Sequence, residues 1–304
     1  MSDILVVGSL AYDSIETPSG AVDHALGGSA NYFSLAASLF AKVKVVGVVG
    51  DDYKNSDIEM LSSRGVDTTG MQVQHGKTFH WKGSYEGDMN EAITHATELN
   101  VFEKFDPVLP ENFKDSEFVF LANISPDLQL KVLNQVKNPI FVGMDTMNFW
   151  ISSKLNDLKA VLKKVDVVLI NEGEAMMLTG AKNGVEAAQR VLELGPKALV
   201  IKRGEYGFMM YTREEGFFIL PAFPIGHVVD PTGAGDTFAG GFFGYLASLG
   251  RKPSLQDLRY ACVKGTNLAS FTIQDFSVAA LAKTNRQDLV ARIEKYKKVI
   301  SLSI

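Results

Sequence analysis

One stretch of the chain combines an anion-binding turn with a carboxylate. It reads D-P-T-G-A-G-D-T-F over residues 230–238, and the small and apolar residues 237–249 that follow predict a helix. The unpaired backbone N–H groups of a glycine turn at a helix start, together with the helix dipole, form a site for phosphate. Asp236 either caps this helix or acts as a general base beside a phosphate that is being transferred. The turn alone leaves both interpretations open.

The complete string favours the second interpretation. Together with the A-G-G-F that follows, it resembles the C-terminal signature of the ribokinase-like (PfkB) family of carbohydrate and nucleoside kinases. The resemblance implies that Asp236 is the catalytic base. It also implies that the N–H groups of Gly233, Ala234 and Gly235 form the anion hole for the phosphoryl group. The family more often has Thr where this chain has Pro231.

A second motif is typical of a magnesium and nucleotide site. Asn171 follows an apolar run, and Glu174 stands three residues later, which predicts a helix capping box. The family has Asn-x-x-Glu at this place. The resemblance therefore implies that Asn171 and Glu174 arrange ATP and Mg²⁺, with Glu174 meeting the metal through water.

Further candidates for the nucleotide site come from two other segments. Lys202 and Arg203 follow an apolar run and precede Gly204, so we expect one of the two cations to contact phosphate, with a solvated hairpin as the alternative. The resemblance places Gly204 near the nucleotide. It also makes Asn267 and Ser270 candidates for the adenine wall, with core packing as the alternative. Some relatives bind a monovalent cation near Asp230 and Thr232, so K⁺ is a candidate cofactor.

The acceptor site is predicted from the N-terminal part of the chain. Asp13 follows the first apolar run, at the strand end where open α/β sheets bind ligands, although a surface turn is the alternative. The resemblance implies that Asp13 bonds substrate hydroxyls. Gly27 and Gly28 allow close backbone approach, and the family has Gly-Gly, three residues and Asn here. Only two residues separate Gly28 from Asn31 in this chain, and all three are substrate-binding candidates.

The elements that position these residues alternate between strands and helices. Short apolar runs predict buried strands at 4–7, 43–49, 118–121, 140–144, 165–170 and 198–201, and a strand end at 225–229. Helices are predicted at 32–40, 57–64, 128–137, 153–164, 184–194 and 260–271. This alternation predicts a mainly parallel sheet covered on both faces. The resemblance implies a ribokinase-like three-layer α/β/α fold, in one α/β domain over residues 1–304 because no linker or repeat interrupts it.

A stretch of different texture predicts a second, smaller sheet. Phe79 and Trp81 alternate with polar residues, and glycines punctuate residues 71–99, which predicts antiparallel strands outside the main sheet. The resemblance implies a β lid over the sugar site, made from about residues 12–26 and 71–99. Such a lid would exclude water and suppress ATP hydrolysis. Relatives sometimes dimerise through lid strands, so a homodimer formed through the lid is a further hypothesis.

Composition excludes several classes of function. The chain has 304 residues, of which 46% are hydrophobic, and a formal net charge of -5 without a basic block, which argues against a nucleic-acid partner. No apolar run is long enough for a membrane span, and no signal peptide is recognised, so we expect a cytoplasmic protein. Cys262 is the single cysteine, which excludes a disulfide framework. The five histidines show no metal-ligand spacing in the sequence.

The predicted function is that of an ATP-dependent kinase. It would transfer the γ-phosphoryl group of Mg-ATP to a hydroxyl of a sugar or a sugar-like alcohol. A nucleoside kinase, similar to adenosine kinase, is the first alternative, because Phe79, Trp81 and Tyr85 could stack on a base. A non-catalytic sugar or nucleotide sensor is the second, and the presence of Asp236, Glu174 and the glycine turn argues against it.

Overall fold

A nine-stranded sheet forms the centre of the computed structural model, which describes residues 2–301. Its strand order is β13-β12-β11-β10-β9-β8-β1-β4-β5, and the seven strands from β11 to β5 are parallel. In this nine-stranded sheet, as far as the described residues show, the antiparallel pairs are β11 with β12 and β12 with β13. The strands are β1 (Ile4–Val7), β4 (Val43–Val49), β5 (Val66–Val73), β8 (Phe118–Leu121), β9 (Phe141–Met144), β10 (Val167–Asn171), β11 (Ala198–Lys202), β12 (Phe208–Thr212) and β13 (Gly216–Leu220).

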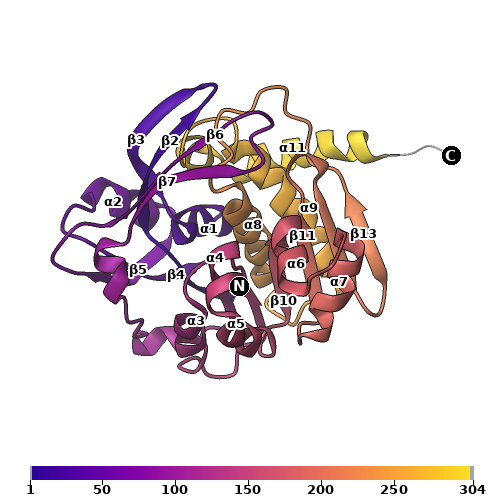
Figure 1. Cartoon of the computed structure of the whole chain (residues 1–304), viewed down its shortest axis with the longest axis horizontal. Helices are drawn as coiled ribbons and strands as arrows, with labels where there is room; N and C mark the ends of the chain where they lie inside the picture. The colour runs from indigo at the N-terminus through magenta and orange to yellow at the C-terminus, as the bar shows by residue number, and fades with distance from the viewer. Residues whose placement is uncertain (1, 302–304) are drawn as a thin grey trace.

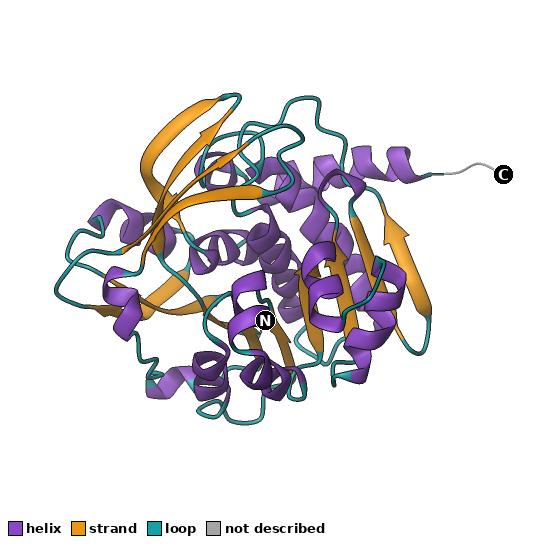
Figure 2. Cartoon of the chain, viewed as in Figure 1, coloured by secondary structure: helices purple, strands orange, loops and turns teal. Residues whose placement is uncertain are grey.

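Helices cover both faces of this sheet, as Figures 1 and 2 show. In β1, Ile4 and Val6 belong to one apolar core and Leu5 and Val7 to the other, because successive side chains of a strand point to opposite faces. The first core includes α1 (Ser29–Ala37), α2 (Asn55–Ser63), α8 (Ala234–Ser248), α9 (Leu255–Thr272), α10 (Ala279–Lys283) and α11 (Arg286–Ile300). The second includes α3 (Pro126–Leu133), α4 (Asn148–Ser153), α5 (Leu155–Leu162), α6 (Glu172–Thr179) and α7 (Gly184–Glu193). The predicted three-layer fold is confirmed.

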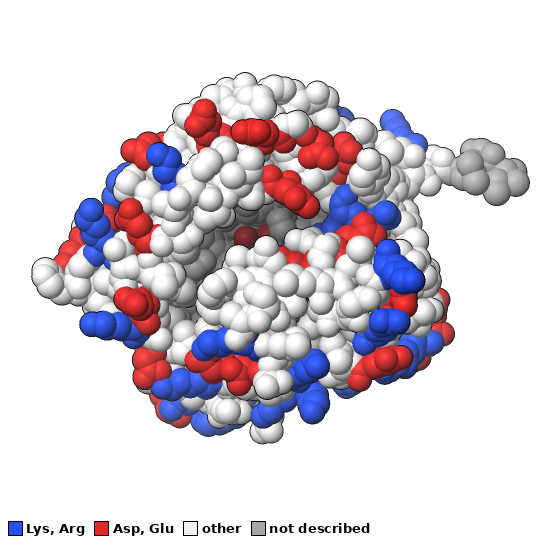
Figure 3. All heavy atoms as spheres, viewed as in Figure 1, with Lys and Arg blue, Asp and Glu red and all other residues white. Residues whose placement is uncertain are grey.

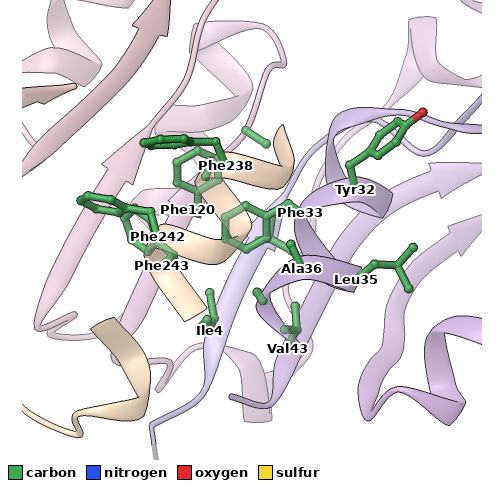
Figure 4. Packing of buried hydrophobic residues seen from close by; sticks show 14 of the residues in the cluster. Ile4, Tyr32, Phe33, Leu35, Ala36, Val43, Phe120, Phe238, Phe242 and Phe243 are labelled. Carbon is green, nitrogen blue, oxygen red and sulfur yellow. The ribbon is translucent and has the colours of Figure 1, made fainter. Parts of the chain in front are cut away.

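Aromatic packing fixes α1 and α8 against the sheet in the first core (Figure 4). The ring of Phe33 stacks on Phe120 with centroids 4.6 Å apart, and Phe243 lies 4.9 Å from Phe120. The glycines of α8 let neighbouring helices approach. A Cβ on Gly240 would lie 2.3 Å from the carbonyl oxygen of Phe33, and one on Gly241 would lie 3.1 Å from the Cα of Gly265. These glycines therefore let α8 pack closely against α1 and α9.

A separate four-stranded sheet lies to one side of the main sheet (Figure 1). Its order is β3-β2-β6-β7, formed by β3 (Gly20–Gly27), β2 (Ala11–Thr17), β6 (Phe79–Tyr85) and β7 (Ala92–Glu98). Two expectations are corrected. The expected insert 71–99 begins too early, because residues 71–73 pair with β4 in the main sheet as part of β5. The sheet is also not wholly antiparallel, since β2 and β6 pair in parallel.

Several predicted boundaries are wrong for local reasons. Residues 225–229 form no strand; the backbone N–H of Val229 instead donates to the carbonyl of Ile273 at 2.8 Å. Helix α9 begins before residue 260, because Ser254 caps it and Asp257 completes a capping box. The expected helix 153–164 starts too early, because Ser153 is the last residue of α4 and α5 begins only after Lys154. The short 3₁₀ helices are η1 (Asn100–Lys104), η2 (Glu111–Phe113) and η3 (Gly204–Tyr206).

Candidate active site

The glycine turn at the start of α8 is closely enclosed. Gly233 caps the helix with φ 73°, and a Cβ on it would lie 2.4 Å from the ring of Tyr32. A Cβ on Gly235 would lie 3.0 Å from the Nζ of Lys202. An aromatic ring therefore lies on one side of the turn and an ammonium on the other. The N–H groups of a helix start and this ammonium together favour an anion at the turn.

Asp236 lies in the first turn of α8 with only part of its surface exposed. Burial, followed by the negative charge of Asp145, raises the pKa of Asp236 to about 7, and Lys202 acts in the opposite direction. A general base works best when its pKa lies near the pH of the reaction. The carboxyl of Asp236 can therefore accept a proton near neutral pH.

Lys202 connects the glycine turn to the ends of the central strands. Its Nζ lies 2.8 Å from Oδ2 of Asp145, and both side chains are largely buried. Burial disfavours the ammonium, but Asp145 and Glu174 outweigh it and raise the pKa of Lys202. Arg203, the other cation of the predicted pair, contacts Glu172 instead, at 3.3 Å. Lys202 is thus the member of the pair that reaches the turn.

Sequence reasoning missed Asp145. It follows β9 directly, and its backbone N–H donates to the carbonyl of Leu121 at 2.9 Å, which places it at the carboxyl edge of the parallel strands. Ligands of open α/β sheets bind at this edge. A carboxylate directly after a predicted strand was therefore the signal that could have identified it.

The capping box predicted at the start of α6 is confirmed. The backbone N–H of Glu174 donates to Asn171 Oδ1 at 2.8 Å, and Glu174 Oε2 accepts from the backbone N–H of Asn171 at 2.8 Å. Burial and the charge of Asp145 raise the pKa of Glu174 to about 7, while Lys202 lowers it. Three carboxylates, those of Asp145, Glu174 and Asp236, therefore share one ammonium. Such a set of oxygen donors fits a hard divalent cation, which would relieve their mutual repulsion.

Asp13 faces the glycine pair from β2 and not from a loop, which corrects the expected position of this residue. A Cβ on Gly27 would lie 1.9 Å from Asp13 Oδ2, so only glycine leaves room for the carboxylate. Burial, then the charges of Asp230 and Asp236, raise the pKa of Asp13 to about 7, although a hydrogen bond from the backbone of Gly28 lowers it. Asp13 and Asp236 are thus close enough to influence each other.

Asn31 supports the glycine pair from within α1. Its side chain is fully buried, its Nδ2 donates to the carbonyl of Gly27 at 2.6 Å, and its Oδ1 accepts from the hydroxyl of Tyr53 at 3.2 Å. Gly28 has φ 89°, and a Cβ there would lie 2.6 Å from the carbonyl of Ser9. The structure therefore places the buried side chain of Asn31 behind the backbone of the glycine pair, and its contact with an acceptor stays a prediction.

The three aromatic residues proposed to stack on a base have different surroundings. Phe79 stacks on Phe102 with centroids 5.4 Å apart. Tyr85 reaches the glycine turn, where its hydroxyl accepts from Thr232 Oγ1 at 3.3 Å. Trp81 pairs with Asp13 in the register of β2 and β6, so the two side chains lie on the same face of the small sheet. Trp81 thus shares the Asp13 face of the small sheet, where its Nε1 donates to Thr94 Oγ1 at 3.2 Å.

A cavity of ≈ 580 Å³ adjoins the glycine turn. Figure 3 shows that the viewed face of the molecule is hollowed below the small sheet. Its size is typical of small-molecule sites. Ser270 lines the cavity, whereas Asn267 is fully buried in α9 with its Nδ2 donating to the carbonyl of Val263 at 2.8 Å. The residues that line the cavity include Lys202, Gly204, Ala234 and Gly235 near the turn. Other lining residues are Ala222, Phe223, Ile225, Thr266, Ala269, Ser270 and Ile273.

Known proteins resemble this chain in sequence and in fold. A family model described as pfkB family carbohydrate kinase matches residues 1–285. The chain is 35% identical over 263 residues to a cytidine kinase of Thermococcus kodakarensis, covering 84% of this chain and 92% of that protein. The nucleoside kinase of Methanocaldococcus jannaschii has a similar fold, with a TM-score of 0.77 at 20% identity over 97% of this chain and 99% of that one. An E. coli protein assigned as a ribokinase II, solved with ATP and Mg²⁺, gives a TM-score of 0.78 at 19% identity over 97% and 100%.

Across residues 2–301, none of the helices combines the length and the apolar character needed to span a membrane.

Proposed function

We propose a reaction for this chain, which belongs to the pfkB family of carbohydrate kinases and is a carbohydrate or nucleoside kinase. It transfers the γ-phosphoryl group of ATP at the turn of Gly233, Ala234 and Gly235. The observation that carries the proposal is the position of Asp236. Its carboxyl has a pKa of about 7 and stands one residue after a turn built to hold an anion. A protein that only binds ligands has no use for a base at this place.

The reaction assigns a role to each of these groups. Asp236 takes the proton of the acceptor hydroxyl as the oxygen forms its bond to the γ-phosphorus, and the bond from that phosphorus to the β-phosphate oxygen breaks to release ADP. The N–H groups of the turn hold the negative charge of the transferred phosphoryl group. Lys202, whose Nζ is 3.0 Å from a Cβ built on Gly235, lies where it can stabilise the same charge.

Magnesium binding is assigned to the end of β10. The carboxylate of Glu174, fixed by its hydrogen bond to the backbone of Asn171, would hold Mg²⁺ through water, with Asp145 close to the same site. An ion held by these carboxylates would supply positive charge that offsets the charge of the phosphates during transfer. The chain's own part is to orient these carboxylates, and the capping box does so for Glu174.

The cavity beside the turn is proposed to hold the nucleotide. Lys202 and Gly204 line its phosphate end, next to Ala234 and Gly235, while Phe223, Ile225 and Ser270 line its more distant, mainly apolar part. A mostly apolar pocket with few polar groups suits a purine ring. Asn267 would contribute by supporting this wall from within α9.

We infer that the acceptor is a nucleoside, which was the first alternative to a free sugar. Two observations support it: the 35% identity to a cytidine kinase, and the position of Trp81 on the Asp13 face of the small sheet. Asp13, with the backbone of Gly27 and Gly28, would hold the hydroxyls of the sugar part. Trp81 would stack on the base, and the small sheet would act as a lid over both.

The test is ADP release from Mg-ATP across pentoses, hexoses, inositols, phosphosugars and nucleosides, with Asp236→Asn beside the wild type. We expect turnover with a nucleoside and its loss in the variant. Turnover with a sugar alone would contradict the proposal that the acceptor is a nucleoside, but it would not contradict the kinase mechanism. Ligand-induced stabilisation without turnover of any acceptor would favour a sensor and contradict the proposal.

Two finer predictions concern K⁺ and a dimer. Asp230 accepts from the backbone N–H of Thr232 at 2.8 Å and of Ser277 at 2.9 Å, so it organises the loop beside the glycine turn. A K⁺ requirement near Asp230 predicts faster turnover in K⁺ than in Na⁺, and equal rates would remove it. A homodimer through the small sheet predicts twice the monomer mass in solution, and a monomeric mass would remove that prediction.

A further inference from the structure

The small sheet has a second face, directed away from Asp13, that carries a cluster of histidines. In the parallel register of β2 and β6, Tyr12 lies beside His80 and Asp13 lies beside Trp81. Because side chains alternate along a strand, Ser14 and His80 lie on the face opposite to Asp13. Side chains on this face are therefore separate from the acceptor site.

A bulge in β3 brings two more residues to this face. The pairing of β2 with β3 shifts register between Asp13 and Ile15, and His24 adopts φ 47° opposite the shift. Bulges redirect side chains and are usually retained for a purpose. Here the bulge stacks the ring of His24 on that of His80, with centroids 4.3 Å apart and an interplanar angle of 20°.

The polar atoms of the cluster converge. Ser14 Oγ donates to Asp23 Oδ1 at 2.5 Å and lies 2.8 Å from His80 Nε2. His24 Nδ1 lies 3.3 Å from the same oxygen of Asp23. One ligand atom from each of Asp23, His24 and His80 lies within 4.8 Å of the others. Small side-chain rotations would bring all three to one ion.

We propose that Asp23, His24 and His80 bind a divalent transition-metal ion of the zinc class. Two imidazoles and one carboxylate are ligands that zinc accepts, whereas magnesium prefers a set of oxygen ligands alone. With three protein ligands, the remaining position is left to water. Both imidazoles line a hollow of ≈ 140 Å³, which is large enough to hold that water.

The surroundings of His80 suit a metal ligand. Its other ring nitrogen, Nδ1, faces Oε2 of Glu98 at 3.8 Å, which is beyond hydrogen-bond distance. A small approach of Glu98 would let it orient the imidazole, as carboxylates commonly do at metal sites. The ion would join β3 to β6 across β2, and so fix the curvature of the small sheet.

The test is calorimetric titration of the untagged, chelator-treated full chain with ZnCl₂, with excess Mg²⁺ present to occupy the carboxylates near Asp236. We expect one Zn²⁺ per chain, and an affinity lower in His24→Ala and in His80→Ala by at least the about 10–100-fold that is typical when a partner behind a ligand is lost. His75→Ala is the matched control, because His75 also contacts an aspartate, Asp51 at 2.7 Å, and is not part of the cluster. Its affinity should equal that of the wild type.

Titration with Co²⁺ gives a second readout, since visible absorption reports ligand number and geometry. We expect a tetrahedral spectrum that His24→Ala abolishes; this exposed residue can be changed without loss of the fold. Absence of Zn²⁺ binding, or equal affinity in His24→Ala, His80→Ala and His75→Ala, would overturn the proposal. None of these outcomes depends on whether the chain is a kinase.

Discussion

The ammonium of Lys202 lies 2.8 Å from Oδ2 of Asp145, so that the ends of β11 and β9 are joined across β10 beside the glycine turn. The same ammonium partly offsets the rise in the pKa of Asp236 and of Glu174 that burial and Asp145 cause. One cation therefore counteracts the mutual repulsion of three carboxylates. The proton affinity of the proposed base depends on this cation as well as on burial.

Removing this cation should shift the pH dependence of turnover. In Lys202→Met the pKa of Asp236 rises further, and we expect the acid limb of kcat/KM to move to higher pH by about one unit, which alone lowers kcat/KM at pH 7 by about fivefold. Lys202→Arg keeps the charge and should restore most of the limb. Arg203→Gln is the control, since Arg203 contacts Glu172 instead. An unchanged limb in Lys202→Met would contradict this role.

The buried carboxyl of Asp236 should also make the protein less stable as pH rises. Its pKa is about 7 in the folded chain against 3.8 in the unfolded chain, so between these values the folded state binds more protons. The free energy of unfolding therefore falls from about pH 4 to about pH 7 and then levels off. Asp236→Asn should show a smaller fall and be more stable than the wild type at pH 8 by about 1–2 kcal/mol. Urea unfolding without nucleotide at pH 5 and pH 8 measures this, and lower stability of the variant at pH 8 would refute it.

Crowding Asp13 should weaken acceptor binding alone. In Gly27→Ala the new Cβ would lie 1.9 Å from Asp13 Oδ2 and must displace the carboxylate. We expect the acceptor KM to rise by about 10–100-fold, as it should in Asp13→Asn, because a hydrogen bond to a charged group is lost. Steady-state kinetics should give an unchanged KM for ATP. Gly226→Ala, where a Cβ meets nothing within 4 Å, is the matched control, and an equal change there would count against the assignment.

The two glycines of the turn should respond differently to alanine. In Gly235→Ala the Cβ meets only the flexible end of Lys202, so we expect normal stability and at least about tenfold lower kcat. In Gly233→Ala the residue has φ 73° and its Cβ would lie 2.4 Å from the Tyr32 ring, so stability should fall by about 1–3 kcal/mol. Melting curves and kcat of both variants separate the effects. Full activity of Gly235→Ala would argue against an anion hole at this turn.

Local sequence was sufficient to predict several central strands and the main motif. The bounds of β1, β4 and β8 were predicted to the residue, because β1 and β8 are continuous apolar runs and only Lys44 and Gly47 interrupt the valines of β4. The capping box of Asn171 and Glu174 was likewise predicted from three-residue spacing. Such features depend on neighbours in the chain, which a sequence displays directly.

The parts that could not be predicted depend on contacts between distant segments. Asp145 belongs to no motif in the sequence. Its role can be recognised only when it is known that β9 and β11 flank β10. His24 and His80 meet only because β3 bulges and β2 pairs with β6 in parallel. Residues 208–220 were assigned no strands, although they form β12 and β13 at the sheet edge. The missing information in each case was strand order or register.

The kinetics of Asp236→Asn test the central claim most directly, once an acceptor is identified. With saturating Mg-ATP and acceptor at pH 8, the loss of a positioned general base should lower kcat by about 10²–10⁴-fold. Calorimetry should give a Kd for Mg-ATP no weaker than that of the wild type, because the turn and Lys202 are unchanged. A kcat within a few-fold of the wild-type value, with binding intact, would contradict the assignment of Asp236 as the base.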